Sequence, residues 1–258
     1  MNDLINKIHC EPFDWLTNRC LNESIDLILM DPPFGVGYSN NFTRTPQAVL
    51  AGDERGATFD CRELAAECFR VLKPDSALFC FTGWSTYPDH YKHFEAAGFS
   101  MREPVIGQKR PSGKTDLYGT FQSNSDWVIF AHKGRFRFRS THLLPNLRAG
   151  TIPNKGRKPV ADFKTRFPSC WFGTEYPWSS ENPATLTSTG VRHPTVKGRV
   201  FCEWLIRVAT DPGAIVLDPF VGSGTTALAA LRSDRRFICG DISQIFCDDA
   251  CRQLSEKP

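Results

Sequence analysis

The sequence contains no long apolar run, and its first residues do not resemble a leader. No stretch of its 258 residues reaches the roughly 20 apolar residues that a membrane-spanning helix requires. The opening MNDLINKIHCEPFDWL lacks the charged and then apolar pattern of a secretory signal peptide. We therefore expect a cytoplasmic protein that does not engage a membrane.

The chain also lacks the cysteine spacing of a metal site or a disulfide framework. Its ten cysteines are scattered, and no Cys-x-x-Cys pair occurs. Structural zinc sites use closely spaced ligand pairs, so no metal is expected, and scattered thiols suit a reducing compartment. The complete Gly-x-x-x-x-Gly-Lys-Ser/Thr pattern is absent as well, which excludes a P-loop nucleotide site.

Net charge is low but unevenly distributed. The chain carries +3 in total, whereas ten Lys and Arg and a single acid between Lys133 and Arg166 give that segment +9 and leave −6 elsewhere. A basic block on a mildly acidic body indicates a polyanionic partner, with a solvated surface loop as the alternative. The candidate DNA-binding residues are Arg135, Arg137, Arg139, Lys155, Arg157 and Lys158, together with Lys109 and Arg110 in a loop that could equally be a plain hairpin connection.

Short apolar segments alternate with segments of helical period along most of the chain. Strands are predicted at 25–30, 77–82, 100–106, 127–132, 214–217 and 236–240, and helices at 61–72, 86–97, 199–210, 225–231 and 243–254. Such alternation is typical of an α/β fold with a mostly parallel sheet and helices on both faces. Residues 135–192 show no sustained period and are predicted to form an irregular insertion.

The segment MDPPFG (30–35) follows the apolar run 25–29. Proline cannot donate a hydrogen bond to a sheet ladder, and the residue before a proline is held extended. The strand must therefore end here, and Asp31 and Phe34 are presented on a stiff loop. From these residues alone, a simple turn that closes a strand is an equal alternative.

The segment VLDPFVGSGTTALAAL (216–231) predicts a strand, a tight glycine turn and a helix. Gly222 and Gly224 allow the backbone to approach a ligand closely, and the helix N-terminus offers free N–H groups. Asp241 ends the next strand, where a carboxylate can accept hydrogen bonds from both ribose hydroxyls. The combination indicates a nucleoside-bearing cofactor. Because Gly222-x-Gly224-x-x-Ala227 also fits the dinucleotide fingerprint, this motif leaves a nicotinamide cofactor open.

Together the two motifs resemble those of the amino-methyltransferases that act on exocyclic amines of DNA bases. Asp-Pro-Pro-Phe resembles their catalytic motif and DPFVGSGTT (218–226) their cofactor motif, in the permuted order of the β group. The likeness extends over nearly the whole chain through four further segments: NESIDLILMDPPF, ECFRVLKPDSALFCF, HPTVKG (193–198) and RRFICGDIS. The sequence departs from the family pattern at Cys10, Glu11, Asp75, Gly198 and Asp241.

This resemblance implies a Rossmann-like, S-adenosylmethionine-dependent methyltransferase sheet that is mostly parallel, with one antiparallel strand from the region around 100–132. It implies S-adenosylmethionine as cofactor, double-stranded DNA as substrate and, by analogy, a homodimer. Residues 135–192 become a target-recognition insert between a catalytic half (1–134) and a cofactor-binding half (193–258) of one domain.

The resemblance also assigns the site residues. The catalytic loop is Asp31, Pro32, Pro33 and Phe34. The cofactor residues are Glu11, Asp31, His193, Thr195, Lys197, Asp218, Phe220, Gly222, Ser223, Gly224, Thr225, Thr226 and Asp241. His193 is open between a base or ligand and a structural histidine, and Lys197 between a ligand of the cofactor carboxylate and a solvated lysine.

The chemistry explains the composition of the Asp-Pro-Pro-Phe loop. An exocyclic base amine is a poor nucleophile because its lone pair is delocalised into the ring. Asp31 and a backbone carbonyl of the proline turn can accept its two N–H groups and direct the lone pair at the methyl sulfonium. Phe34 offers a flat face to a base that has left the helix.

The sequence favours adenine N6 as the methyl acceptor. In the resembling family, Asp at the first motif position usually accompanies adenine, and a carboxylate is a stronger acceptor than a hydroxyl. Cytosine N4 is the alternative within the class. A nicotinamide-dependent oxidoreductase would leave Asp-Pro-Pro-Phe and the basic insert unexplained, and intact motifs argue against an inactive DNA-binding protein.

Overall fold

The computed structural model describes residues 1–33, 60–108, 125–139, 171–172 and 196–255. The described residues form one nine-stranded sheet with the order β1-β9-β8-β2-β3-β6-β5-β7, and β4 pairs with β6. The strands are β1 (Lys7–Cys10), β2 (Ile25–Met30), β3 (Leu72–Thr82), β4 (Ser100–Met101), β5 (Val105–Gln108), β6 (Ser125–His132), β7 (Trp171–Phe172), β8 (Ile215–Asp218) and β9 (Arg236–Asp241). The helices are α1 (Phe13–Arg19), α2 (Cys61–Val71), α3 (Tyr87–Ala96), α4 (Arg199–Ala209), α5 (Thr225–Arg232) and α6 (Gln244–Ser255).

The sheet is parallel except for β6. Strand β6 runs antiparallel to β3, β4 and β5, whereas β1, β9, β8, β2 and β3 pair in parallel and β5 pairs in parallel with β7. The predicted single antiparallel strand within the region 100–132 is therefore confirmed. No described helix is long and apolar enough to cross a membrane.

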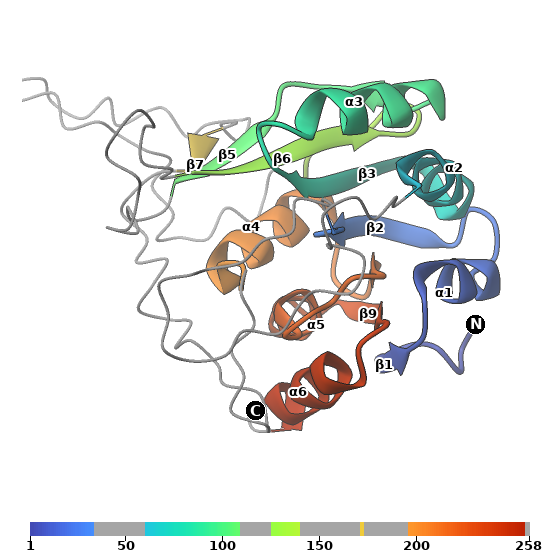
Figure 1. Ribbon diagram of the computed structural model, residues 1–258, viewed down its shortest axis with the longest axis vertical. Helices are drawn as coiled ribbons and strands as arrows, with labels where there is room; N and C mark the ends of the chain where they lie inside the picture. The colour runs from blue at the N-terminus through green and yellow to red at the C-terminus, as the bar shows by residue number, and fades with distance from the viewer. Residues whose placement is uncertain (34–59, 109–124, 140–170, 173–195, 256–258) are drawn as a thin grey trace, which may run out of the picture.

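Helices cover both faces of the sheet (Figure 1). Along β2, Leu27 and Leu29 face the core cluster formed with α4 and α5, while Ile28 and Met30 face the cluster formed with α1, α2 and α3. Burial on both faces explains why β2 is apolar almost throughout, as central parallel strands are. On α2, the buried side chains recur with helical spacing.

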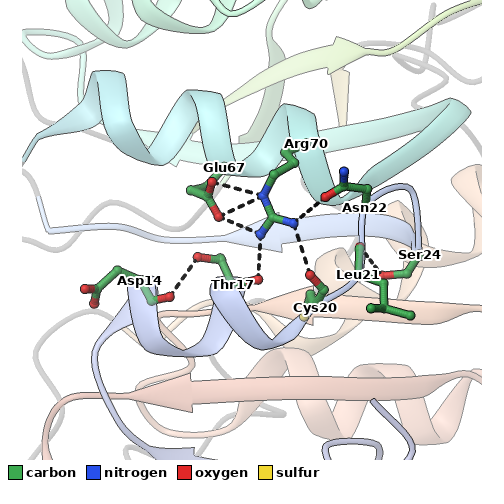
Figure 2. A network of polar contacts seen from close by, with 8 residues as sticks. All are labelled: Asp14, Thr17, Cys20, Leu21, Asn22, Ser24, Glu67 and Arg70. Atoms are coloured by element: carbon green, nitrogen blue, oxygen red, sulfur yellow. Dashed lines mark hydrogen bonds and ion pairs between the residues drawn. The ribbon is translucent and has the colours of Figure 1, made fainter.

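Arg70 on α2 ties this helix to the end of α1 (Figure 2). Its guanidinium donates to the carbonyls of Thr17 and Cys20 and to Asn22 Oδ1, at 2.8, 3.1 and 2.7 Å, and is paired with Glu67 on its own helix. The last carbonyls of a helix have no partner within it. One planar cation therefore satisfies the end of α1 and fixes it against α2.

Several elements differ from the sequence-based prediction. Strand β3 starts at Leu72 rather than at 77, with a register shift before Ala77, and Asp75 within the shifted part has a φ of 61°. This is the position where the resembling family has glycine, and Asp tolerates the left-handed region better than most residues. The strand predicted at 100–106 is two strands, β4 and β5, separated by residues that include Pro104. Strands β1 and β7 and helix α1 were not predicted.

The segment 135–139 packs with the body of the protein. Phe136 and Phe138 lie against the core cluster and contact the ring of Phe130, with centroid distances of 5.6 and 5.5 Å. Strand β7 also joins the sheet from within 135–192 by pairing with β5. Parts of the predicted insert are thus continuous with the main sheet.

Candidate active site

Acidic side chains gather at one edge of the sheet, where the parallel strands end. Asp31 directly follows β2, Asp218 ends β8, Asp241 ends β9, and Glu11 directly follows β1. The register places Cys10 beside Asp241 and Asp218 beside Cys239, so these strand ends are neighbours. In open α/β sheets, ligands bind outside the carboxyl ends of the strands. This edge is therefore the candidate active site.

The glycine turn and Asp241 form one hydrogen-bonded unit. The backbone N–H of Gly222 donates to Asp241 Oδ2 at 3.0 Å, and that of Ser243 donates to Oδ1 at 2.9 Å. Burial raises the pKa of Asp241 although these backbone bonds oppose the rise. A carboxylate has about four acceptor positions in all, so Asp241 keeps acceptor capacity for a ribose hydroxyl beside its backbone donors. The geometry fits the predicted adenosyl cofactor.

Gly222 and Gly224 both have positive φ, at 50° and 90°. A Cβ on Gly224 would lie 2.9 Å from Ala250 Cα on α6. This turn therefore needs glycine at 224 for two reasons, its backbone conformation and the close approach of α6. Thr225 and Thr226 begin α5 immediately after it and are buried.

Asp218 is almost completely buried at the start of the same turn. Its Oδ1 accepts the backbone N–H of Phe220 at 3.0 Å. Burial raises the pKa of Asp218 to about 7, against the opposing effect of hydrogen bonds from Thr226 and Phe220. The charged form of Asp218 would be stabilised by a cationic group, such as the amino group of a methionine moiety.

Lys197 forms an ion pair with Asp31. Its Nζ is 2.6 Å from Asp31 Oδ2 and 5.1 Å from the centroid of the Phe81 ring, and its side chain is 15% exposed. Burial lowers the pKa of Lys197, but the carboxylates of Asp31 and Asp126 outweigh this and leave it raised. Such a position does not fit the solvated lysine that the sequence left open.

Asp126 is a carboxylate near Lys197 that the sequence did not predict. It lies in β6 just before Trp127, which pairs with Thr82 at the end of β3. The antiparallel direction of β6 thus brings the start of this strand to the edge where the parallel strands end. A single acid in a strand carries no local signal, so only the sheet topology could have identified it.

Other candidate residues fall into two groups. The first group lies outside the described residues and consists of Phe34, Lys109, Arg110, Lys155, Arg157, Lys158, His193 and Thr195. Arg135, Arg137 and Arg139 follow β6, whose last residue, His132, pairs with Ala77 near the other end of β3. These three arginines therefore lie toward the opposite end of the sheet from Asp31, and Arg139 pairs with Asp211 at 3.0 Å.

Solved structures share this fold. The complex of M1.HpyAVI with SAM superposes with a TM-score of 0.60 at 19% identity, covering 96% of this chain and 99% of that one. The cytosine-N4-specific PvuII DNA methyltransferase gives 0.63 at 17% identity, covering 91% and 81%. The chain therefore has the fold of these methyltransferases, as the sequence predicted, and the first of these structures holds the cofactor that the sequence predicts.

Sequence comparison defines the family. The profile of the N6/N4 DNA methylase family matches residues 25–252, and the chain belongs to that family. YubD of Escherichia coli (strain K12) is 31% identical over 217 residues, which cover 83% of this chain and 75% of YubD. The DNA adenine methyltransferase YhdJ of the same organism is 25% identical over 238 residues, 90% of this chain and 76% of YhdJ. The protein is therefore a DNA methyltransferase that uses S-adenosylmethionine, and the nicotinamide alternative is set aside.

Proposed function

We propose that the protein methylates the exocyclic N6 of adenine in double-stranded DNA. The observation that carries this proposal is the Asp31 carboxylate, which follows β2 at the edge where Asp218 and the Gly222–Asp241 unit lie. A carboxylate is a charge-assisted acceptor for an amine N–H. The relative YhdJ, named a DNA adenine methyltransferase, supports the same base.

S-adenosylmethionine supplies an electrophilic methyl group when bound. In the proposed site, Asp241 and the Gly222 turn would hold the ribose, and Asp218 would bind the amino group of the methionine part. Asp31 accepts an N–H of the target amine and orients its lone pair. Transfer would form the nitrogen–methyl bond and break the methyl–sulfur bond of the cofactor, and the amine would release one proton toward Asp31 or water. Positioning and electrostatics then supply most of the acceleration.

Cytosine N4 is the second candidate, because the PvuII enzyme with the same fold is named cytosine-N4-specific. Adenine N6 and cytosine N4 both present two N–H groups beside a ring nitrogen, so Asp31 can serve either. The test is to treat unmethylated DNA with enzyme and S-adenosylmethionine, digest it to nucleosides and identify the product by mass spectrometry. N6-methyladenine supports the proposal, and N4-methylcytosine as the sole product replaces it with the second candidate.

For the remaining parts of the chain we keep the sequence-based division as a proposal. Residues 135–192 would contact the target sequence, while 1–134 and 193–258 together form the methyltransferase domain. The described residues 135–139 and β7 pack with that domain, so the recognition function would belong to the rest of the segment.

A further inference from the structure

The Asp31–Lys197 pair lies where several elements of the sheet edge converge. Asp31 follows β2, Phe81 belongs to β3, Asp126 belongs to β6, and Lys197 lies two residues before the start of α4. Side-chain exposure is 20% for Asp31 and 15% for Lys197, so water screens this pair only partly. An ion pair in such surroundings is coupled much more strongly than an exposed one.

The other charged groups around Asp31 include several acids. Asp126 on β6 interacts electrostatically with Lys197. Asp218 on β8 interacts electrostatically with Asp31 and with Asp241 on β9. Glu203 on α4 is paired with Arg199. Burial raises the pKa of the Cys80 thiol on β3 and of the Cys202 thiol on α4, so both stay uncharged near neutral pH. Lys197 thus brings a positive charge into a neighbourhood rich in carboxylates.

From this arrangement we infer that Lys197 is a positioning residue for methyl transfer, which holds Asp31 in its ionised, acceptor form. The inference rests on the proposed role of Asp31 as acceptor for the target amine. A protonated carboxyl group presents an O–H toward the amine in place of a lone pair. Burial and neighbouring acids both favour that protonated form, and an ammonium at 2.6 Å opposes them.

The chain offers a matched control on the same strand. Lys73 Nζ is also 2.6 Å from an aspartate of β2, Asp26 Oδ1. Asp26 lies near the start of β2, whereas Asp31 follows its end. A Lys73→Met variant removes an equally short Lys–Asp ion pair without touching the candidate active site.

The experiment measures kcat/KM against pH for the wild type and for Lys197→Met, Lys197→Arg and Lys73→Met, with unmethylated DNA and S-adenosylmethionine. The acid limb of Lys197→Met should move up by about 1 to 3 pH units, the usual effect of an adjacent opposite charge. Below that limb, each unit corresponds to about a tenfold lower rate. Lys197→Arg and Lys73→Met should keep the limb near its wild-type position.

Binding of S-adenosylhomocysteine, measured by calorimetry, distinguishes a Lys197 that positions Asp31 from a Lys197 that binds the cofactor carboxylate, the role considered from the sequence. If Lys197 holds the cofactor carboxylate instead, Lys197→Met weakens this binding markedly and leaves the acid limb in place. That result overturns the inference, as does a uniform loss of activity at every pH. Should Lys197→Met not fold, Lys197→Gln takes its place.

A second measurement keeps the inference separate from the proposed function. The Asp31 carboxyl can be titrated by ¹³C NMR in wild type and in Lys197→Met, with its signal assigned by Asp31→Asn. A higher Asp31 pKa in Lys197→Met supports the inference, and equal values overturn it. Absence of methylation by the wild-type enzyme would count against the proposed function, while this titration would still decide the role of Lys197.

Discussion

Asp218 has an ionisation that opposes folding. Burial raises its pKa from 3.8 to about 7 in the folded protein, so the native state holds a proton that the unfolded chain releases. The contribution of this group to stability therefore falls as pH rises from about 4 to about 7, and it is constant above that range.

We predict that Asp218→Asn removes this pH dependence. The free energy of unfolding of the variant, relative to that of wild type, should rise by about 1 to 4 kcal/mol as the pH goes from 5 to 8, because wild type loses stability as Asp218 ionises. Thermal unfolding of both proteins at several pH values measures the difference. The control is Asp211→Asn, whose carboxylate side chain is 69% exposed. A constant difference between Asp218→Asn and wild type across this range would contradict the assignment.

At Asp31, we expect that replacing the carboxylate by an amide removes the negative charge and one of the two acceptor oxygens but little volume. Asp31→Asn should slow methyl transfer about 100-fold or more, as loss of one preorganised polar group in a reaction site does. Single-turnover rates test this, and calorimetry with S-adenosylhomocysteine should show that most cofactor affinity remains. A variant with full activity would remove Asp31 from the mechanism.

Side-chain pairing at the site was beyond what the sequence alone could provide. Asp31 and Lys197 are 166 positions apart in the chain, and the motif that contains Lys197 suggested a cofactor ligand. Asp126 has no motif at all. By contrast, the positions of Asp218 and Asp241 at strand ends and of Gly222 in the turn before α5 were predictable, because the adjoining elements have clear sequence patterns.

At the scale of elements, the α5 turn illustrates a steric requirement that sequence patterns only suggest. Gly224 has a φ of 90°, and a Cβ there would lie 2.9 Å from Ala250 Cα. Gly213 has a similar φ of 81° with nothing within 4 Å of such a Cβ. The two glycines therefore separate backbone strain from the packing of α5 against α6.

We predict that Gly213→Ala costs about 1 to 2 kcal/mol of unfolding free energy, the usual penalty of left-handed backbone for alanine. Gly224→Ala should cost that amount plus an overpacking penalty of about 1 to 3 kcal/mol. Urea unfolding of both variants measures the difference. Equal losses would mean that α6 moves away without cost.

Strand prediction succeeded where burial on both faces produces an apolar run, as in β2 and in most of β3. It failed for β1, a short edge strand that begins with the exposed Lys7. The prediction also merged β4 and β5 into one strand. Its sequence pattern ran through Pro104, whereas the backbone pairing is interrupted there.

Across the whole molecule, the basic residues fall at different places relative to the site. Arg135, Arg137 and Arg139 lie toward the opposite end of the sheet from Asp31. We predict that replacing these three with Gln leaves the salt dependence of DNA affinity nearly unchanged. The matched triple variant at Lys155, Arg157 and Lys158 should flatten the log–log slope by about 0.9 for each DNA phosphate that is no longer neutralised.

Fluorescence anisotropy with a labelled duplex at several salt concentrations tests both variants. A flatter slope in the first triple variant would place DNA on the far end of the sheet. No change in either would mean that the basic block is a solvated surface. The predicted homodimer is a separate question, which sedimentation at several concentrations resolves.

The pairing of β1 with β9 and of β2 with β8 has a consequence for the order in which the chain is synthesised. Strands β2, β3 and β6 can pair with one another early in synthesis. The other edge of β2 stays unpaired until β8 has been made, and β1 stays unpaired until β9, the last described strand, has been made. Until then the nascent chain exposes an apolar strand edge of the kind that invites association between chains. A ribosome stalled before Ile215 should therefore carry a chain that recruits chaperones, and release of the remaining residues should end that dependence.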